Sequence, residues 1–179
     1  VRQHFYKTRN AYKRMEPMVE YYFHFYAAKL NGPPIPYFEE EEADMPVQHP
    51  GGMQVIEEMI FVGKSIVNND KLKNQLAELV RYAIELPTVT ESFAFDDANI
   101  FDAFVEELYR ITALGITGFD SQTAVNGLTE CKEALSGLQQ YISVYKKNYS
   151  KNLPGKFEKL NLLINNAKLY LDRNKDFVS

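Results

Sequence analysis

Apolar residues recur every three or four positions along almost the whole chain, and this spacing constrains the fold more than any other feature. The first run covers residues 5–30 and predicts an amphipathic helix of about seven turns. Pro17 lies inside this run and should bend the helix, because proline removes one backbone hydrogen bond. Strand-like alternation never extends beyond a few positions, and residues 88–95 are the only doubtful stretch. The sequence therefore predicts an all-α fold.

Turn-forming residues divide the rest of the chain into further helices. These helices are expected at about residues 53–67, 70–86, 96–114, 122–149 and 154–171. Pro87 should end the third helix, Asp96 or Asp97 should cap the fourth, and Pro154 fits the first turn of the last. Six helices with short connections predict an up-and-down bundle, one domain over residues 1–179. A loop rich in proline and glutamate, at about residues 31–52, should lie across it.

Composition and charge exclude several classes of protein. The net charge of -4 argues against a nucleic-acid surface, which needs clustered lysine and arginine. The chain has a single cysteine, Cys131, which excludes an internal disulfide, Cys-pair metal sites and covalent c-type haem attachment. Leucines flank Cys131 at helical spacing, so its side chain should be buried as a small hydrophobic group. No apolar run approaches the roughly 20 residues of a membrane span. We find no catalytic constellation and expect no cofactor and no enzymatic activity.

A motif at the start of the second helix resembles a known family. Residues 52–57 read Gly-Met-Gln-Val-Ile-Glu, followed by an apolar run. This segment resembles the G-x-H-x-x-E signature of the imelysin family, with Gln54 at the position of the histidine. The resemblance implies an imelysin-like helical bundle. It also implies a metal-binding or metallopeptidase role that depends on that histidine.

A longer resemblance spans nearly the whole chain. Residues 11–16, residues 30–36, the glutamates at 39–42 and residues 114–121 resemble the helical region that precedes some bacterial di-haem cytochrome c peroxidases. This resemblance implies an exported domain of the periplasm or cell envelope, often the N-terminal part of a longer polypeptide. Peroxidase chemistry would then belong to an attached haem domain rather than to this chain.

Two departures shape what the resemblances imply for function. Imelysin-family proteins are about two bundles long, whereas 179 residues make roughly one bundle. Glutamine is a poor ligand for zinc or iron, and imidazole is a good one. The expected function is therefore non-catalytic binding of a protein partner or small ligand, accessory to a di-haem peroxidase. An iron- or metal-binding protein of the imelysin type is the alternative, and an imelysin-type metallopeptidase is a remote one.

A few residues have the chemistry of metal ligands. Glu16, Glu20 and His24 follow one another at intervals of four, so they share a helix face, which Glu57 could approach from the second helix. His49 precedes the motif and could bring an imidazole near Gln54 and Glu57. Carboxylate bundles use Glu-x-x-His pairs from two helices, and this chain contains none. A solvated face, or carboxylates paired with arginine, is the preferred interpretation, and no metal site is expected.

The preferred polar cluster joins the first two helices. Gln54 and Glu57 lie one turn apart on the second helix, and Arg9, Tyr12 and Glu16 lie on one side of the first. If these helices pack together, Glu57 should meet Arg9 or Tyr12, with Gln54 completing the hydrogen bonds, because a buried charge needs a partner. Two alternatives stay open: Glu57 faces water, or the cluster lines a pocket for a small polar ligand.

A second ion pair is expected in the turn at residues 115–120. Arg110 precedes this turn and Asp120 ends it. A salt bridge between them would hold the turn in place, which is a structural role rather than a chemical one.

Overall fold

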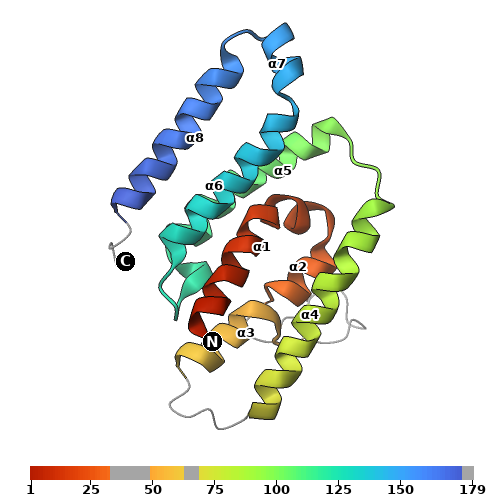
Figure 1. Ribbon diagram of the computed structural model, residues 1–179, viewed down its shortest axis with the longest axis vertical. Helices are drawn as coiled ribbons and strands as arrows, with labels where there is room; N and C mark the ends of the chain where they lie inside the picture. Colours follow the sequence, from red (N-terminus) through yellow and green to blue (C-terminus); the bar gives the residue numbers. More distant parts are fainter. Residues whose placement is uncertain (33–48, 63–68, 175–179) are drawn as a thin grey trace, which may run out of the picture.

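The structure is a computed structural model that describes residues 1–32, 49–62 and 69–174, and every regular element in these ranges is helical (Figure 1). The α-helices are α1 Arg2–Tyr22, α2 His24–Leu30, α3 Gly52–Phe61, α4 Asn69–Glu91, α5 Asp97–Arg110, α6 Gly127–Val144, α7 Lys146–Asn152 and α8 Lys156–Arg173. A π-helical turn, Ile111–Gly115, and a 3-10 turn, Phe119–Ser121, lie between α5 and α6. The predicted all-α fold is confirmed, and the described residues form eight α-helices rather than the six expected.

Two of the expected helices are each divided in two. The first breaks at Phe23, whose backbone leaves the helical region, six residues after Pro17. Pro17 itself lies inside α1. The expected long helix at 122–149 begins only at Gly127, and it breaks at Tyr145, between α6 and α7.

Proline positions misled the prediction of two helix ends. Pro87 was expected to end the third helix, but α4 continues through it to Glu91. Val89, beyond the proline, still packs against the core, so burial holds the last turn despite the lost hydrogen bond. Pro154 lies before α8, which begins at Lys156 after a left-handed Gly155. Asp96 caps α5 as predicted, because its side chain accepts a hydrogen bond from the backbone N–H of Ala98 at 2.9 Å.

Other predicted features lie outside the described residues. Most of the proline- and glutamate-rich loop belongs to residues 33–48, and the predicted end of the second helix belongs to residues 63–68. The doubtful stretch at 88–95 is helical as far as Glu91, and its remaining residues form no strand.

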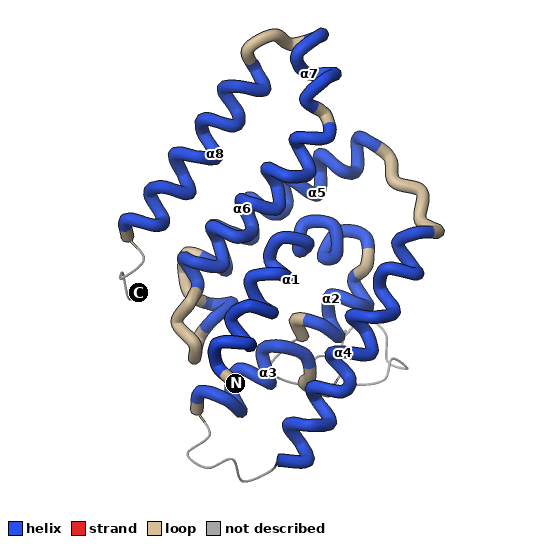
Figure 2. Tube along the Cα trace, viewed as in Figure 1, coloured by secondary structure: helices blue, strands red, loops and turns tan. Residues whose placement is uncertain are grey.

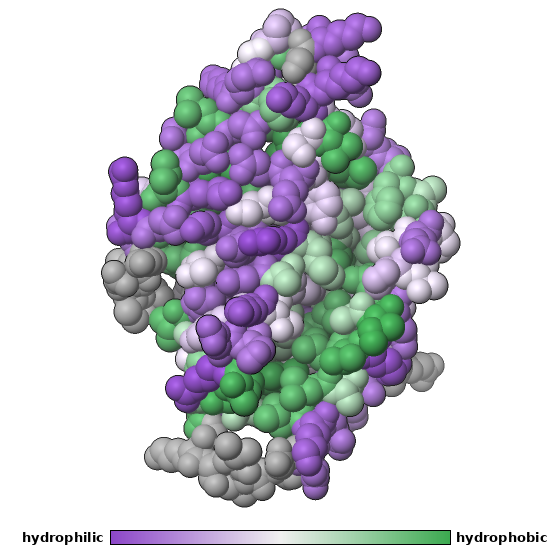
Figure 3. All heavy atoms as spheres, viewed as in Figure 1, coloured by the Kyte–Doolittle hydropathy of each residue, from purple (hydrophilic) through white to green (hydrophobic). Residues whose placement is uncertain are grey.

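Helix α1 runs between two groups of helices, as Figure 2 shows, with α2, α3 and α4 on one side and α5, α6 and α8 on the other. Each group contributes side chains to its own apolar core. The first core is rich in aromatic rings, among them Phe5, Tyr12 and Phe23. The second core is built mainly from the aliphatic residues of α6 and α8. On the face in Figure 3, apolar residues gather over the half that contains α2, α3 and α4, and polar residues cover α6 and α8.

The most extensive contact between two helices joins α1 to α6. A Cβ atom on Gly137 would lie only 2.1 Å from the backbone carbonyl oxygen of Arg14, so only glycine fits there. This close approach brings the polar side of α1 against α6. In the ranges that the structure describes, no helix is both long and apolar enough to cross a membrane.

Candidate functional site

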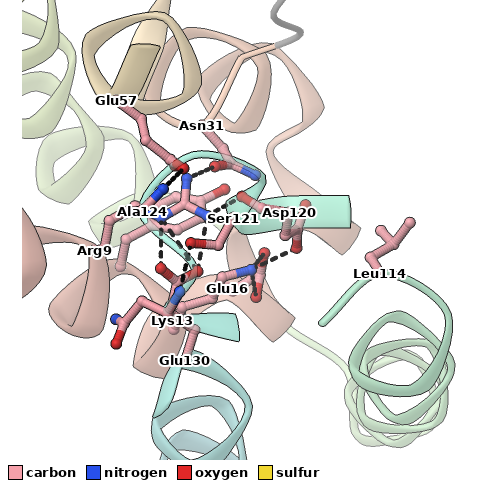
Figure 4. Close-up of polar contacts among 12 residues, drawn as sticks. Arg9, Lys13, Glu16, Asn31, Glu57, Leu114, Asp120, Ser121, Ala124 and Glu130 are labelled. Carbon is pink, nitrogen blue, oxygen red and sulfur yellow. Dashed lines mark hydrogen bonds and ion pairs between the residues drawn. The ribbon is translucent and has the colours of Figure 1, made fainter. Parts of the chain in front are cut away.

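Arg9 lies at the centre of a buried ionic network on the polar side of α1 (Figure 4). Its Nε donates to both carboxylate oxygens of Glu130 at 3.2 Å, and its Nη2 donates to Oε2 of Glu130 at 2.8 Å. Its Nη1 donates to Oδ1 of Asn31 at 3.0 Å, and Nη2 also donates to the backbone carbonyl of Asp120. Burial alone would lower the pKa of Arg9, but Glu130 outweighs burial and raises it. One guanidinium therefore ties α1 to α6, to the end of α2 and to the 3-10 turn.

Lys13 extends the network one turn along α1. Its Nζ donates to both oxygens of Glu16, at 2.7 and 2.9 Å, and to Oδ2 of Asp120 at 2.7 Å. Burial works against ionisation of Asp120, but Lys13 more than compensates and lowers the pKa of that carboxyl. The predicted pairing of Arg110 with Asp120 is therefore wrong: Arg110 pairs with Glu16 at 3.2 Å and Glu20 at 3.3 Å.

Tyr12 finds its partner on its own helix. Its hydroxyl donates to Oε1 of Glu20 at 2.7 Å, and the phenol ring belongs to the first apolar core. Burial, followed by the charge of Glu20, raises the pKa of Tyr12 well above its usual value. Tyr12 therefore links the ionic network to the apolar core and stays a neutral donor.

Glu107 is the anomalous member of the network. Its side chain on α5 is 1% exposed, and within the described part of the chain neither carboxyl oxygen has a hydrogen-bond partner. The nearest cation is Arg110, whose Nε lies 3.9 Å from Oε2. Burial, and next the charge of Glu16, raises the pKa of Glu107 to about 10. Its burial beside the charge of Glu16 therefore favours the protonated, neutral form of this carboxyl.

A small cavity of about 10 Å³ lies beside Glu107, close to the size that one water molecule requires. Its lining includes Glu16, Lys13 and Arg110 from the network together with Cys131. Cys131 is buried, as predicted, and burial raises the pKa of its thiol to about 12. A thiol in this state is a poor nucleophile.

Glu57 is also buried, so the alternative that it faces water is wrong. Its Oε1 accepts hydrogen bonds from the backbone N–H of Thr123 at 3.0 Å, the hydroxyl of Thr123 at 3.1 Å and the backbone N–H of Ala124 at 2.7 Å. The predicted direct partners, Arg9 and Tyr12, are bonded elsewhere. Glu57 instead fastens α3 to the turn that precedes α6.

A larger pocket of about 190 Å³ opens next to Glu57. α3 contributes Gln54, Glu57 and Glu58 to its wall, and Val62 follows them. The opposite wall comes from Phe119, Asp120, Gln122 and Thr123. Gln54 therefore lines a pocket. Its backbone N–H donates to the carbonyl of Asn31, at the end of α2, at 3.1 Å.

The histidines named as weak metal-ligand candidates lie apart from this network. His24 and His49 are both exposed, whereas Glu20 and Glu57 are engaged with Tyr12 and the 123–124 turn. Over the described ranges, no group of three or more His, Cys, Asp or Glu side chains has a geometry that could hold a metal ion.

The structure thus buries four of the five residues of the predicted cluster, Arg9, Tyr12, Glu16 and Glu57, but pairs them differently. Sequence reasoning missed Lys13, Glu107 and Glu130, which are also buried. A usable signal was present: Glu107 falls between Phe104 and Ile111 at helical spacing, and both of those residues belong to the second core. A charged residue on an apolar helix face indicates a buried partner.

Three segments singled out in the sequence meet at this site. Asn31 comes from residues 30–36, Glu57 from the motif at 52–57 and Asp120 from residues 114–121, and Figure 4 shows all three around Arg9. The left-handed Gly118 makes the turn that presents Asp120. No known protein family, curated protein or solved structure matches the chain, so the resemblances stay predictions.

Proposed function

We propose that this chain is a non-catalytic binding domain whose ligand is a cationic group, carried by a small molecule or by a basic side chain of a protein partner. The observation that carries the proposal is the pocket of about 190 Å³ beside the ionic network. Its wall combines the carboxyls of Glu57, Glu58 and Asp120 with the amides of Gln54 and Gln122. Carboxylates and amide oxygens accept hydrogen bonds from ammonium and guanidinium groups.

The pocket is fixed before any ligand arrives. Three donors hold Oε1 of Glu57 in place. None of these three contacts uses the other carboxylate oxygen, Oε2. Lys13 holds the carboxylate of Asp120, because its Nζ donates to Oδ2 at 2.7 Å. A preorganised acceptor costs less entropy on binding than a mobile one.

The surroundings also favour a positive charge. Even without the carboxyl of Glu107, whose raised pKa favours its neutral form, five carboxylates gather around the three cations of the network; they are Glu16, Glu20, Glu57, Asp120 and Glu130. Phe119, largely exposed at the pocket, offers an aromatic face on which a cation can stack. Negative groups that line a concave surface raise the local concentration of cations.

A non-catalytic role fits the chemistry of the site. The one thiol, Cys131, is buried with a raised pKa, and His4, His24 and His49 are exposed on the surface. A general base must lie within hydrogen-bond reach of the group that it serves, and an exposed histidine away from the pocket does not meet this requirement.

We extend the proposal to the biological setting that the resemblances imply. The chain would be an imelysin-like domain of the bacterial periplasm or cell envelope, accessory to a di-haem cytochrome c peroxidase. The support is that the segments carrying the resemblance supply Asn31, Glu57 and Asp120 to one site. A pair of C-x-x-C-H motifs downstream in the same reading frame would bear this out, and their absence from both the frame and the neighbouring genes would refute it.

The cation proposal is tested by binding of arginine amide, followed by NMR chemical shifts. We expect shifts at residues 54–58 and 119–123 that weaken with added salt. Glu58→Gln should reduce the affinity severalfold without unfolding the protein, because Glu58 is exposed. Glu106→Gln, an exposed glutamate on α5, is the matched control and should leave the affinity unchanged. Absence of binding, or equal losses in both variants, would overturn the proposal.

A further inference from the structure

The long helix α4 is apolar on two opposite sides. One side carries Tyr82 and Leu86, which are buried in the first core against α2 and α3. The other side carries Leu76, Val80 and Ile84, whose side chains are 38%, 55% and 70% exposed. Helix α4 lies along one edge of the molecule, as Figure 1 shows. An apolar stripe of this kind on an outer helix is typical of an interaction surface.

The exposed side follows the spacing of a coiled-coil seam. Ala77, Val80, Ile84 and Pro87 are all exposed and succeed one another at intervals of three, four and three residues. Lys73 continues this spacing four residues before Ala77, and Glu91 continues it four residues after Pro87; both are exposed. These six residues, 73, 77, 80, 84, 87 and 91, form the α4 seam. Alternating intervals of three and four keep such residues on one face.

The charges of the α4 seam identify its partner. A cation stands at one end and an anion at the other, with only apolar residues between them. We propose that the seam binds a second copy of this chain in an antiparallel homodimer. In that register Lys73 faces Glu91 of the second copy, and Val80 faces Ile84 of the second copy. A parallel pair would instead place lysine against lysine and glutamate against glutamate.

In the antiparallel register, every residue of the α4 seam faces a complementary residue of the second copy. Each of the pairs 73–91, 77–87 and 80–84 is centred on the same point along α4, beside residue 82, so one two-fold axis relates them all. A two-fold interface of this kind is isologous: a contact from the first copy to the second is repeated from the second to the first. The ion pair 73–91 and the apolar contacts 77–87 and 80–84 therefore each form twice. The inference does not depend on the proposed cation pocket.

The seam spans about 27 Å of helix, at 1.5 Å per residue. Two helices in contact over this length bury less area than a standard stable interface, so we expect a reversible equilibrium that depends on concentration. Sedimentation velocity over a concentration series of the wild-type protein should show monomer and dimer in exchange. A wild-type protein that stays monomeric up to its solubility limit overturns the proposal.

One substitution tests the apolar centre of the seam. Ile84→Glu places a carboxylate opposite Val80 at two symmetric positions, and it should raise the dissociation constant at least about a hundredfold. The fold should survive, because Ile84 is largely exposed. Leu163→Glu on α8 is the matched control, with a side chain 56% exposed outside the seam, and it should leave the dimer unchanged. A dimer that survives Ile84→Glu, or that is lost equally in the control, overturns the proposal.

A charge exchange tests the register. Lys73→Glu and Glu91→Lys should each weaken the dimer roughly threefold to tenfold, because each creates two like-charge contacts. The double variant should recover wild-type affinity, and an equimolar mixture of the two single variants should form a heterodimer more stable than either homodimer. If the double variant stays as weak as the single ones, the antiparallel register is wrong.

Discussion

Replacing Glu107 with glutamine should make the protein more stable, and increasingly so as the pH rises. Glu107 is buried without a hydrogen-bond partner among the described residues, and burial, with the charge of Glu16, raises its pKa from 4.5 to about 10. Between these values the folded protein keeps a proton that the unfolded chain releases. The free energy of unfolding therefore falls as the pH rises through this window.

The size of the effect follows from the difference between the two pKa values. Each pH unit in the window costs about 1.4 kcal/mol of unfolding free energy, so Glu107 removes about 3 kcal/mol at pH 7 relative to pH 4.5. Glutamine has nearly the same shape and does not titrate. Its amide can donate a hydrogen bond toward Glu16, as the protonated carboxyl of Glu107 can, and it keeps this donor at every pH.

Urea titrations at pH 5, 6, 7 and 8 measure this effect. The difference in unfolding free energy between Glu107→Gln and the wild type should grow by up to about 4 kcal/mol from pH 5 to pH 8. Glu20 also has a pKa raised by burial, but it is present in both proteins, so to first approximation its contribution cancels in the difference. Glu106→Gln, on the exposed side of α5, should show no such growth. A difference that stays flat or declines with pH would refute the reasoning.

Three further outcomes test the network. Arg9→Met strands Glu130 without its partner in a buried site, so it should cost about 3–5 kcal/mol in a denaturant titration, and a second change, Glu130→Leu, should recover most of the loss. Glu57→Ala leaves two backbone amides and a hydroxyl without their acceptor and should cost about 3 kcal/mol, whereas Glu57→Gln, which keeps one oxygen, should cost less by the same titration. Cys131 should resist a thiol reagent in the folded protein at pH 8 and react at once in urea, because its thiol is buried with a pKa of about 12; rapid labelling under native conditions would contradict its placement.

The composition of the candidate site was partly predictable. Helical spacing placed Arg9, Tyr12 and Glu16 on one side of α1, and the structure buries that side. The pairing was not predictable, because helical spacing gives no information on which distant segment lies opposite. Arg9 bonds to Glu130, 121 residues away, and Glu57 bonds to a turn 66 and 67 residues away. Those partners depend on how α1, α3 and α6 are rotated and packed.

The sequence by itself determined the features that depend only on residues close together in the chain. Periodicity made the chain helical, Asp96 capped α5, the glycines at 115 and 118 ended the helical run, and Cys131 fell on a buried face. These features arise within a few turns of chain, where spacing and backbone preference decide the outcome.

Only the tertiary structure decided the rest. Helix α4 continues through Pro87 because Val89 beyond it gains burial in the first core, which outweighs a local hydrogen bond. The pairing of Arg9 with Glu130 exists because the close contact at Gly137 brings α6 against the polar side of α1, and the packing of α5 on α1 adds Glu107 to the network. Burial and electrostatic pairing act between segments far apart in the chain, so they appear only once the helices have packed.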